Sequence, residues 1–198
     1  MREYVIKRVS GAPDWDKIPA APIDHQLWDT KTDITAGAQL AWDEDAIYVR
    51  MFAKETEIRR ELTGVLDSVC DDSCLEFFLQ PTETVSYLNV EMNPNCAVFF
   101  GFGSCLENLI RLIPEDWDPL QPTAEVGEDH WNITYRVPVS MIRQFYPTFE
   151  PKSGLKMKGN FYKCGDSTSN PHFISWNKVE CEDPAFHVPA YFGTFILE

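Results

Sequence analysis

The sequence predicts an all-β fold, namely a two-sheet antiparallel β-sandwich with one or two short helices. Three observations support this prediction: apolar and polar residues alternate with a period of two, turn-forming residues separate the alternating runs, and 14 prolines are spread along the chain. Hydrophobic residues make up 44% of the 198-residue chain, which is enough for a sizeable core. No internal repeat or change of composition marks a linker, so residues 1–198 are predicted to form one domain.

Four runs alternate strictly enough to be strands that place one face on a core. They cover residues 46–52, 74–79, 87–93 and 131–137. In the third run the inward positions are Leu88, Val90 and Met92, and the outward positions are Asn89, Glu91 and Asn93. An antiparallel sheet with one solvated face gives this pattern, because successive side chains point to opposite sides.

Turn and helix signals separate these runs. Residues 43–45, 93–95 and 127–129 (Asp-Glu-Asp, Asn-Pro-Asn and Gly-Glu-Asp) predict hairpin turns. Residues 56–62 are predicted to form a short helix. A second short helix is predicted at residues 139–145, between two prolines.

The outward faces of several predicted strands carry hydrogen-bonding side chains. Where those strands adjoin, the side chains would form a polar sheet surface able to bind a ligand. The alternation also fits a simpler alternative, an ordinary face covered by solvent. The residues concerned are Glu76, Asn89, Glu91, Asn132, Thr134, Arg136, Asn160 and Tyr162.

The charge balance narrows the classes of partner. The chain has 31 acidic and 17 basic residues and a formal net charge of −14. Nucleic acids and anionic membranes require clustered Lys and Arg, so neither is an expected partner. Neutral sugars, or cations such as calcium, suit this surface better. The N-terminal residues lack the hydrophobic stretch of a signal peptide, which predicts a cytoplasmic protein unless a leader has been removed.

Six cysteines stand at positions 70, 74, 96, 105, 164 and 181. Cys70 and Cys74 are four residues apart, and no Cys or His lies near them at zinc-ribbon spacing. Cys74 and Cys96 fall in apolar strand patterns, where a free thiol behaves as a small hydrophobic side chain. We therefore expect buried or half-buried free thiols, with a metal or redox centre as the alternative.

Several segments, in order along the chain, resemble family 9 carbohydrate-binding modules, a group related to the DOMON-type sandwiches. They are residues 40–49, 71–79, 131–138 and the closing pieces at 159–164, 175–176 and 186–193. The resemblance implies an immunoglobulin-like or DOMON-like sandwich that binds sugars without catalysis. In the best-known members the reducing end of a glucan or xylan chain lies between two tryptophan faces. Carboxylate, amide and basic side chains hold its hydroxyl groups.

Carried over to this chain, the resemblance implies that Trp176 is one clamp tryptophan and that Glu76 is the strand carboxylate. Cys70 stands where the second clamp tryptophan is expected, and the loss of that wall would remove ~1 kcal/mol or more of stacking. The implied carbohydrate site also takes in polar side chains of the neighbouring strands, namely Glu91, Asn89, Asn160, Tyr162 and Arg136. No cofactor is expected, although some family members bind structural calcium.

Other functions remain open from the residues alone. Trp176 follows an apolar run and could belong to the core. Glu76 with Asp72 or Glu91 could supply the two carboxylates of a glycoside hydrolase. Met92 and His187 could ligate haem, as in some DOMON-type domains. A protein-interaction sandwich would instead show an exposed apolar patch. Asp71 and Asp72 fit a turn cap better than a cation site.

Overall fold

A computed structural model describes residues 1–113 and 119–198 of the chain. The structure is built mainly of β-strands, with one α-helix and several single turns of 3-10 helix. The strands are β1 (Glu3–Arg8), β2 (Ala21–Ile23), β3 (His25–Gln26), β4 (Thr35–Trp42), β5 (Ala46–Lys54), β6 (Cys74–Gln80), β7 (Tyr87–Met92), β8 (Val98–Gly103), β9 (Ile110–Leu112), β10 (Thr123–Val126), β11 (His130–Pro138), β12 (Lys156–Cys164), β13 (Phe173–Ser175) and β14 (Gly193–Leu197). The helices are α1 (Val139–Phe145), η1 (Trp15–Lys17), η2 (Val69–Asp71), η3 (Leu106–Asn108) and η4 (Pro189–Tyr191).

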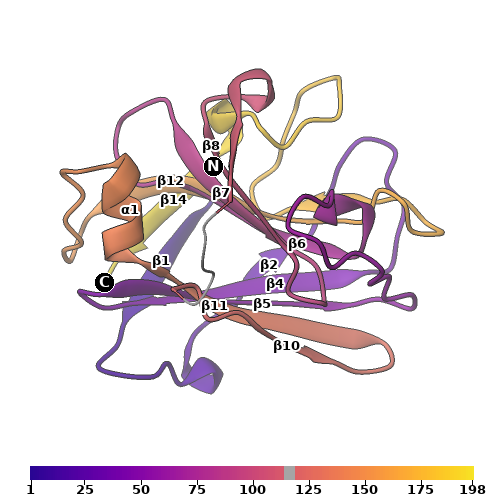
Figure 1. Cartoon of the computed structure of the whole chain (residues 1–198), viewed down its shortest axis with the longest axis horizontal. Coiled ribbons are helices and arrows are strands. Elements are labelled where there is room, and N and C mark those ends of the chain that lie inside the picture. Colours follow the sequence, from indigo (N-terminus) through magenta and orange to yellow (C-terminus); the bar gives the residue numbers. More distant parts are fainter. Residues whose placement is uncertain (114–118) are drawn as a thin grey trace.

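The strands form a curled sheet whose two halves face each other (Figure 1). The hydrogen-bonded order is β10-β11-β5-β4-β1-β14-β12-β6-β7-β8-β9. We call β2, β4, β5, β10 and β11 the β5 layer, and β6, β7, β8, β9, β12 and β14 the β6 layer. Strand β1 joins them, because its first residues pair in parallel with β14 and its last residues pair in parallel with β4.

The main hydrophobic core lies between the two layers. Ile47, Val49 and Met51 of the β5 layer and Leu88 and Val90 of the β6 layer belong to one cluster, each at most 2% exposed. The predicted inward faces are therefore confirmed, and the fold is a curled β-sheet sandwich. It is not the predicted pair of antiparallel sheets, because β1 pairs in parallel with both layers and joins them into one sheet. Burial of this much apolar surface is the main force that holds the layers together.

The predicted hairpins and one of the two helices are also confirmed. Residues 43–45 join β4 to β5, where Asp43 Oδ1 accepts the backbone N–H groups of Asp45 and Ala46, each at 2.9 Å. Helix α1 has the predicted bounds and begins directly after Pro138.

The prediction of a helix at residues 56–62 is wrong, because that segment is irregular. The buried carboxylate of Asp72 accepts the backbone N–H groups of Glu61 and Leu62, each at 2.8 Å. Arg59 also forms an ion pair with Asp72. These side-chain contacts replace the backbone hydrogen bonds of a helix and tie the segment to the end of β6.

The outer face of the β6 layer is not solvated as the alternation predicted. Asn89, Glu91 and Asn93 are at most 6% exposed. The chain between β13 and β14 lies over this face, and with residues 27–28 it forms a second hydrophobic cluster that includes Phe78, Tyr87, Tyr162 and Phe192. The outer face of the β5 layer keeps the predicted pattern, because Asn132, Thr134 and Arg136 are half-buried.

All six cysteines are free thiols, as expected. Cys74 and Cys164 are buried and the other four are half-buried. Within the described residues, no helix is long and apolar enough to cross a membrane.

Candidate functional site

A cavity of about 220 Å³ lies between the outer face of the β6 layer and the segments that cover it. Strands β6, β7 and β12 provide its floor, and the segment before β14 provides much of its wall. The lining residues are Trp28, Cys70, Glu76, Glu91, Leu106, Cys164, Asp166, Phe173, Pro184, Ala185, Phe186 and His187. The cavity therefore combines carboxylates, thiols and aromatic rings.

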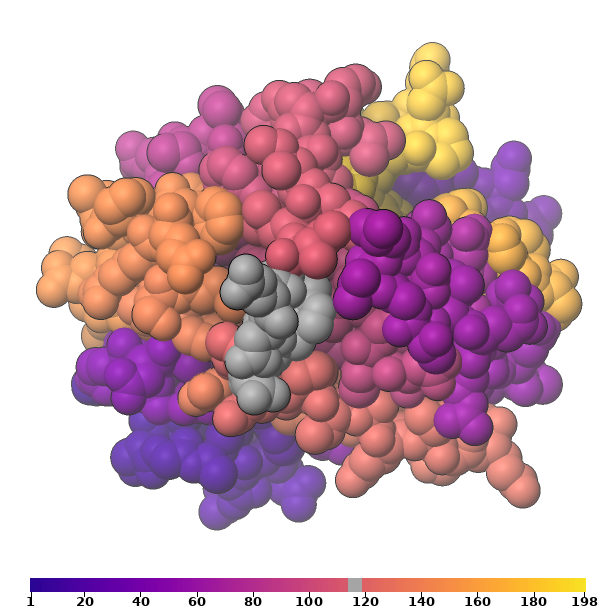
Figure 2. All heavy atoms as spheres, viewed as in Figure 1, coloured from indigo at the N-terminus to yellow at the C-terminus, as the bar shows by residue number. Residues whose placement is uncertain are grey.

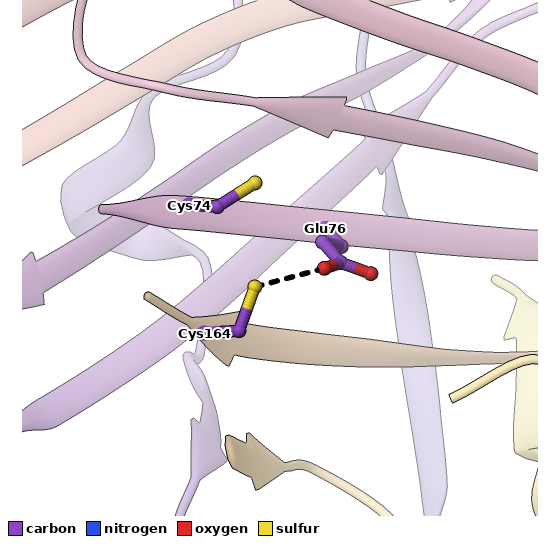
Figure 3. A group of neighbouring side chains, drawn as sticks. All are labelled: Cys74, Glu76 and Cys164. Atoms are coloured by element: carbon purple, nitrogen blue, oxygen red, sulfur yellow. Dashed lines mark hydrogen bonds between the residues drawn. The ribbon is translucent and has the colours of Figure 1, made fainter. Parts of the chain in front are cut away.

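Two carboxylates from neighbouring strands lie on the cavity floor. Glu76 of β6 and Glu91 of β7 are directly opposite each other in the antiparallel register, and both are at most 6% exposed. Asn89 Nδ2 donates to Glu91 Oε1 at 2.7 Å, and Cys164 Sγ donates to Glu76 Oε1 at 3.1 Å (Figure 3). Strand alternation puts all four side chains on the same face of the sheet.

Burial controls the charge of this pair. It raises the pKa of Glu76 and of Glu91, and the charge of Glu91 raises the pKa of Glu76 further. Arg111 partly opposes the shift at Glu91. Because two adjacent buried carboxylates resist joint ionisation, the pair retains a proton at a higher pH than free carboxylates do. It can then offer both hydrogen-bond donors and acceptors to a ligand.

Arg111, whose charge acts on Glu91, joins two surface segments near the cavity floor. Its guanidinium carbon lies 4.5 Å from the ring centroid of Phe99, which is opposite Glu91 in β8. Its Nη1 and Nη2 donate to the backbone oxygens of Leu66 and Asp67, each at 2.8 Å. The β8–β9 hairpin and the loop before η2 are thus joined, and they lie next to each other on the surface (Figure 2).

The aromatic wall consists of Trp28 and Phe186, together with Phe173. The Trp28 ring lies 5.9 Å from that of Phe186 with the planes 30° apart, and 5.5 Å from that of Phe173 in an edge arrangement. Phe186 stacks in turn on Tyr162. Trp28 Nε1 donates to the backbone oxygen of Cys181 at 3.0 Å, so a hydrogen bond fixes the indole while part of it remains exposed.

Trp28 has a left-handed backbone, with φ of 54°. This conformation is unfavourable for a bulky residue and is found more often at ligand-binding sites than elsewhere. The sequence reasoning missed Trp28. A signal was present, because this tryptophan stands in a mainly polar stretch, Asp24 to Asp33, ahead of the first predicted strand.

Trp176, the expected clamp residue, lies in the core instead. It is 2% exposed, stacks on Phe195 with the planes 17° apart and meets Phe161 edge to face. Gly193 leaves room for the indole, since a Cβ there would lie 2.4 Å from Trp176 Cζ3. The buried position does not fit the clamp role that the resemblance implied for Trp176, and the alternative, that Trp176 belongs to the core, is correct.

The other predicted site residues have different surroundings. Tyr162 is fully buried and supports Phe186 from below, and its hydroxyl donates to the Phe186 backbone oxygen at 3.0 Å. Asn160 is also fully buried and holds the backbone of Asn177 through two hydrogen bonds. Arg136 lies in the β5 layer and donates to Pro119, so it does not line the cavity.

The geometry favours neither the glycoside hydrolase alternative nor the haem-binding alternative. Asp72 is fully buried and is bound by backbone N–H groups and Asn93, outside the cavity. Glu76 and Glu91 are neighbours on one floor, whereas glycosidase carboxylates flank the bond they cleave. Met92 faces the core, while His187 packs on Phe78 across the outer face of the same sheet. Met92 and His187 therefore cannot ligate one haem iron.

A structural calcium ion does not fit the cluster of metal-ligating side chains found in the described part of the chain. That cluster is Cys74, Glu76 and Cys164, whose ligand atoms all lie within 4.8 Å of one another. Calcium takes oxygen ligands, and two of these three donors are sulfur.

Comparisons with known proteins give a consistent result. A model of the family described as "Carbohydrate-binding family 9" matches residues 8–197. A structure from Bacteroides uniformis, described as a candidate carbohydrate-binding protein, is 28% identical, with a TM-score of 0.89 over 100% of this chain and 99% of that one. No curated protein matches the chain.

Two more distant structures have the same fold. Both are of a carbohydrate-binding module from Caldicellulosiruptor kristjanssonii, one in complex with glucose and one with cellotriose. Each is 15% identical to this chain, and each match covers 100% of this chain. The glucose complex has a TM-score of 0.69 with 96% of its own chain matched, and the cellotriose complex has a TM-score of 0.70 with 94% matched.

Proposed function

The chain belongs to carbohydrate-binding family 9, and we propose that it binds one sugar residue, or the end of a short oligosaccharide, in the cavity floored by Glu76 and Glu91. The family consists of non-catalytic binding modules. One observation carries the proposal: a half-exposed aromatic wall and buried hydrogen-bonding carboxylates meet in a single cavity.

The chemistry of a sugar matches these two surfaces. The C–H face of a pyranose packs against Trp28, and its hydroxyl groups exchange hydrogen bonds with Glu76, Glu91 and the exposed Asp166. The cavity volume of about 220 Å³ is below the ~300–1,000 Å³ usual for drug-sized ligands, which favours one ring over a chain segment. The relative with glucose bound supports a glucose-type ligand.

The test is calorimetric titration of glucose, cellobiose, cellotriose and xylobiose into the reduced, metal-free protein. We expect Trp28→Ala and Glu91→Gln each to weaken binding by about 10-fold or more, which corresponds to ~1.4 kcal/mol. Trp15→Ala is the matched control, because Trp15 is also half-buried but belongs to η1 beside the β5 layer. The absence of heat from the whole sugar panel, or full affinity in Trp28→Ala, would contradict the proposal.

Three broader expectations go with this function. We propose that residues 1–198 form one domain and that its finer class is a DOMON-like or immunoglobulin-like sandwich, supported by the continuous strand order and the shared core. We propose that nucleic acids and membranes are not partners, supported by the net charge of −14. A cytoplasmic location remains a prediction.

A further inference from the structure

The floor of the cavity holds a second group of side chains, of which the sugar proposal uses only Glu76. Cys74 and Cys164 are cross-strand neighbours on β6 and β12, and Glu76 lies two residues after Cys74 on the same face (Figure 3). All three are at most 3% exposed. Glu76 and Cys164 also line the cavity, so the group of three is surrounded by protein except where it faces the cavity.

We propose that Cys74, Cys164 and Glu76 form a binding site for a zinc-type divalent ion at the cavity floor. Zinc binds thiolates at ~2.3 Å and carboxylate oxygens at ~2.0–2.2 Å in tetrahedral geometry, which separates neighbouring ligand atoms by roughly 3–4 Å. The three ligand atoms here lie within 4.8 Å of one another, and Cys164 Sγ is 3.1 Å from Glu76 Oε1. Small side-chain rotations therefore suffice to close the site.

The donor set selects the kind of metal. Two sulfurs exclude calcium and magnesium, which take oxygen ligands, and one carboxylate makes the site less suited to copper(I) than an all-sulfur site. Three protein ligands leave the fourth tetrahedral position for water or another group. That position faces the cavity, which Cys70 and Glu91 also line.

No ion pair that the structure describes competes with a bound cation for the carboxylates of the floor. In the described part of the chain, no ion pair reaches Glu76 or Glu91, although both are buried. The nearest buried lysine, Lys163, points to the opposite side of β12 and pairs with Glu55. A divalent ion bound at Glu76 would supply the positive partner that no ion pair in the described residues supplies.

The strands hold the three ligands without a loop rearrangement. Cys74 and Glu76 are on β6, Cys164 is on β12, and seven register pairs join the two strands. This rigidity lowers the entropy cost of assembling the site. The site goes beyond the proposed sugar function and does not depend on it.

The experiment uses the full chain, reduced and freed of metal with a chelator, then dialysed against Zn²⁺ or Co²⁺. We expect one bound Zn²⁺ per chain by elemental analysis, and a thiolate-to-cobalt charge-transfer band with tetrahedral visible bands for Co²⁺. Cys74→Ser, Cys164→Ser and Glu76→Gln should each weaken Zn²⁺ affinity, the two cysteine changes by more than about 100-fold. Cys105→Ser is the matched control, because Cys105 is a half-buried thiol outside the cluster.

A measurement on the unmodified protein guards against variants that fail to fold. Zn²⁺ should raise the unfolding temperature of the reduced wild-type chain, and Ca²⁺ should not, because only an ion bound to the folded state stabilises it by mass action. Less than one tight equivalent of Zn²⁺ in the wild type would overturn the proposal. So would cobalt spectra that are the same in wild type and in the Cys74→Ser/Cys164→Ser double variant. Sugar titration of the metal-free protein is scored separately, so failure of one proposal is distinguishable from failure of the other.

Discussion

The ring of Phe186 lies flat on the ring of Tyr162, with the centroids 4.1 Å apart and the planes 11° apart. Tyr162 is on β12, and Phe186 is in the segment that covers the outer face of the β6 layer. This contact anchors the cavity wall to the sheet. It also gives a buried role to a tyrosine that strand alternation placed on an exposed face.

Removal of this ring should open the cavity wall. Phe186→Ala is expected to reduce sugar affinity by about 10-fold or more, because Trp28 loses its stacking partner. Calorimetric titration with glucose or cellobiose measures the change. Phe145→Ala on α1 is the control, since it also truncates a half-buried phenylalanine but lies outside the cavity. Equal affinity in the two variants would show that the wall plays no part in binding.

Trp176 should contribute to stability and not to ligand contact. Trp176→Ala is expected to lower the free energy of unfolding by ~3–5 kcal/mol, the usual cost of removing a large buried aromatic side chain. Urea denaturation measures this change, and the half-buried Trp15→Ala serves for comparison. A Trp176→Ala protein that keeps its stability but loses sugar binding would restore the clamp role that the family resemblance implied.

Gly101 should matter through the position of Asn89. A Cβ at Gly101 would lie 2.3 Å from Asn89 Oδ1, so Gly101→Ala must move the amide that donates to Glu91. We expect weaker sugar binding in titrations with a small change in stability. Gly127→Ala is the control, because the three atoms nearest to its added Cβ belong to the exposed and movable ring of His130. Unchanged affinity in Gly101→Ala would show that Asn89 does not position the carboxylate.

Acidification should destabilise the protein through His187. Burial lowers the pKa of His187 to about 4, from about 6.5 when unfolded, so between these pH values the unfolded chain binds more protons. The free energy of unfolding should therefore fall as the pH decreases from 6.5 to 4, by about 1 kcal/mol from this residue after allowance for its partial exposure.

Urea denaturation at pH 7 and pH 5 measures this effect. His187→Asn should show a smaller loss than wild type, because an amide can keep the hydrogen bond to the Tyr87 hydroxyl without taking up a proton. The comparison isolates His187, because the contributions of His172, whose pKa is also lowered to about 4, and of Glu76 and Glu91, whose raised pKa values act in the opposite direction, are shared by both proteins. The exposed His130→Asn should behave as wild type. A His187→Asn protein with the full loss would contradict the assignment.

A buried ion pair joins the two layers at one edge. Lys163 Nζ of β12 lies 3.0 Å from Glu55 Oε2, which follows β5, and both side chains are at most 2% exposed. Glu55→Gln should lower the free energy of unfolding by ~3–5 kcal/mol, because it leaves the lysine charge buried and unpaired. Adding Lys163→Met should recover part of this loss in a double-mutant cycle. Glu180→Gln, in the exposed ion pair with Lys178, should lower the free energy of unfolding by less than ~1 kcal/mol. Equal losses of stability in Glu55→Gln and Glu180→Gln would contradict the prediction.

The sequence by itself determined four of the strands (β5, β6, β7 and β11), the hairpin turns and α1. These features follow from local rules: side chains alternate along a strand, and Pro138 and Pro147 limit the helix. The family motifs also identified Glu76 correctly as a residue of the β6 strand, and the structure places it on the cavity floor. The segment at residues 56–62 escaped local rules, because the carboxylate that organises it comes from Asp72, farther along the chain.

The tertiary structure decided which face of the β6 layer is buried and which tryptophan lines the cavity. Alternation shows that Asn89 and Glu91 share a face, but it cannot show that the segment before β14 folds back over them. Trp176 pairs with Gly193 in the core, and Trp28 meets Phe186 at the wall, in contacts that span 17 and 158 residues of chain. Side-chain burial depends on such distant segments, and the alternation of neighbouring residues carries no information about them.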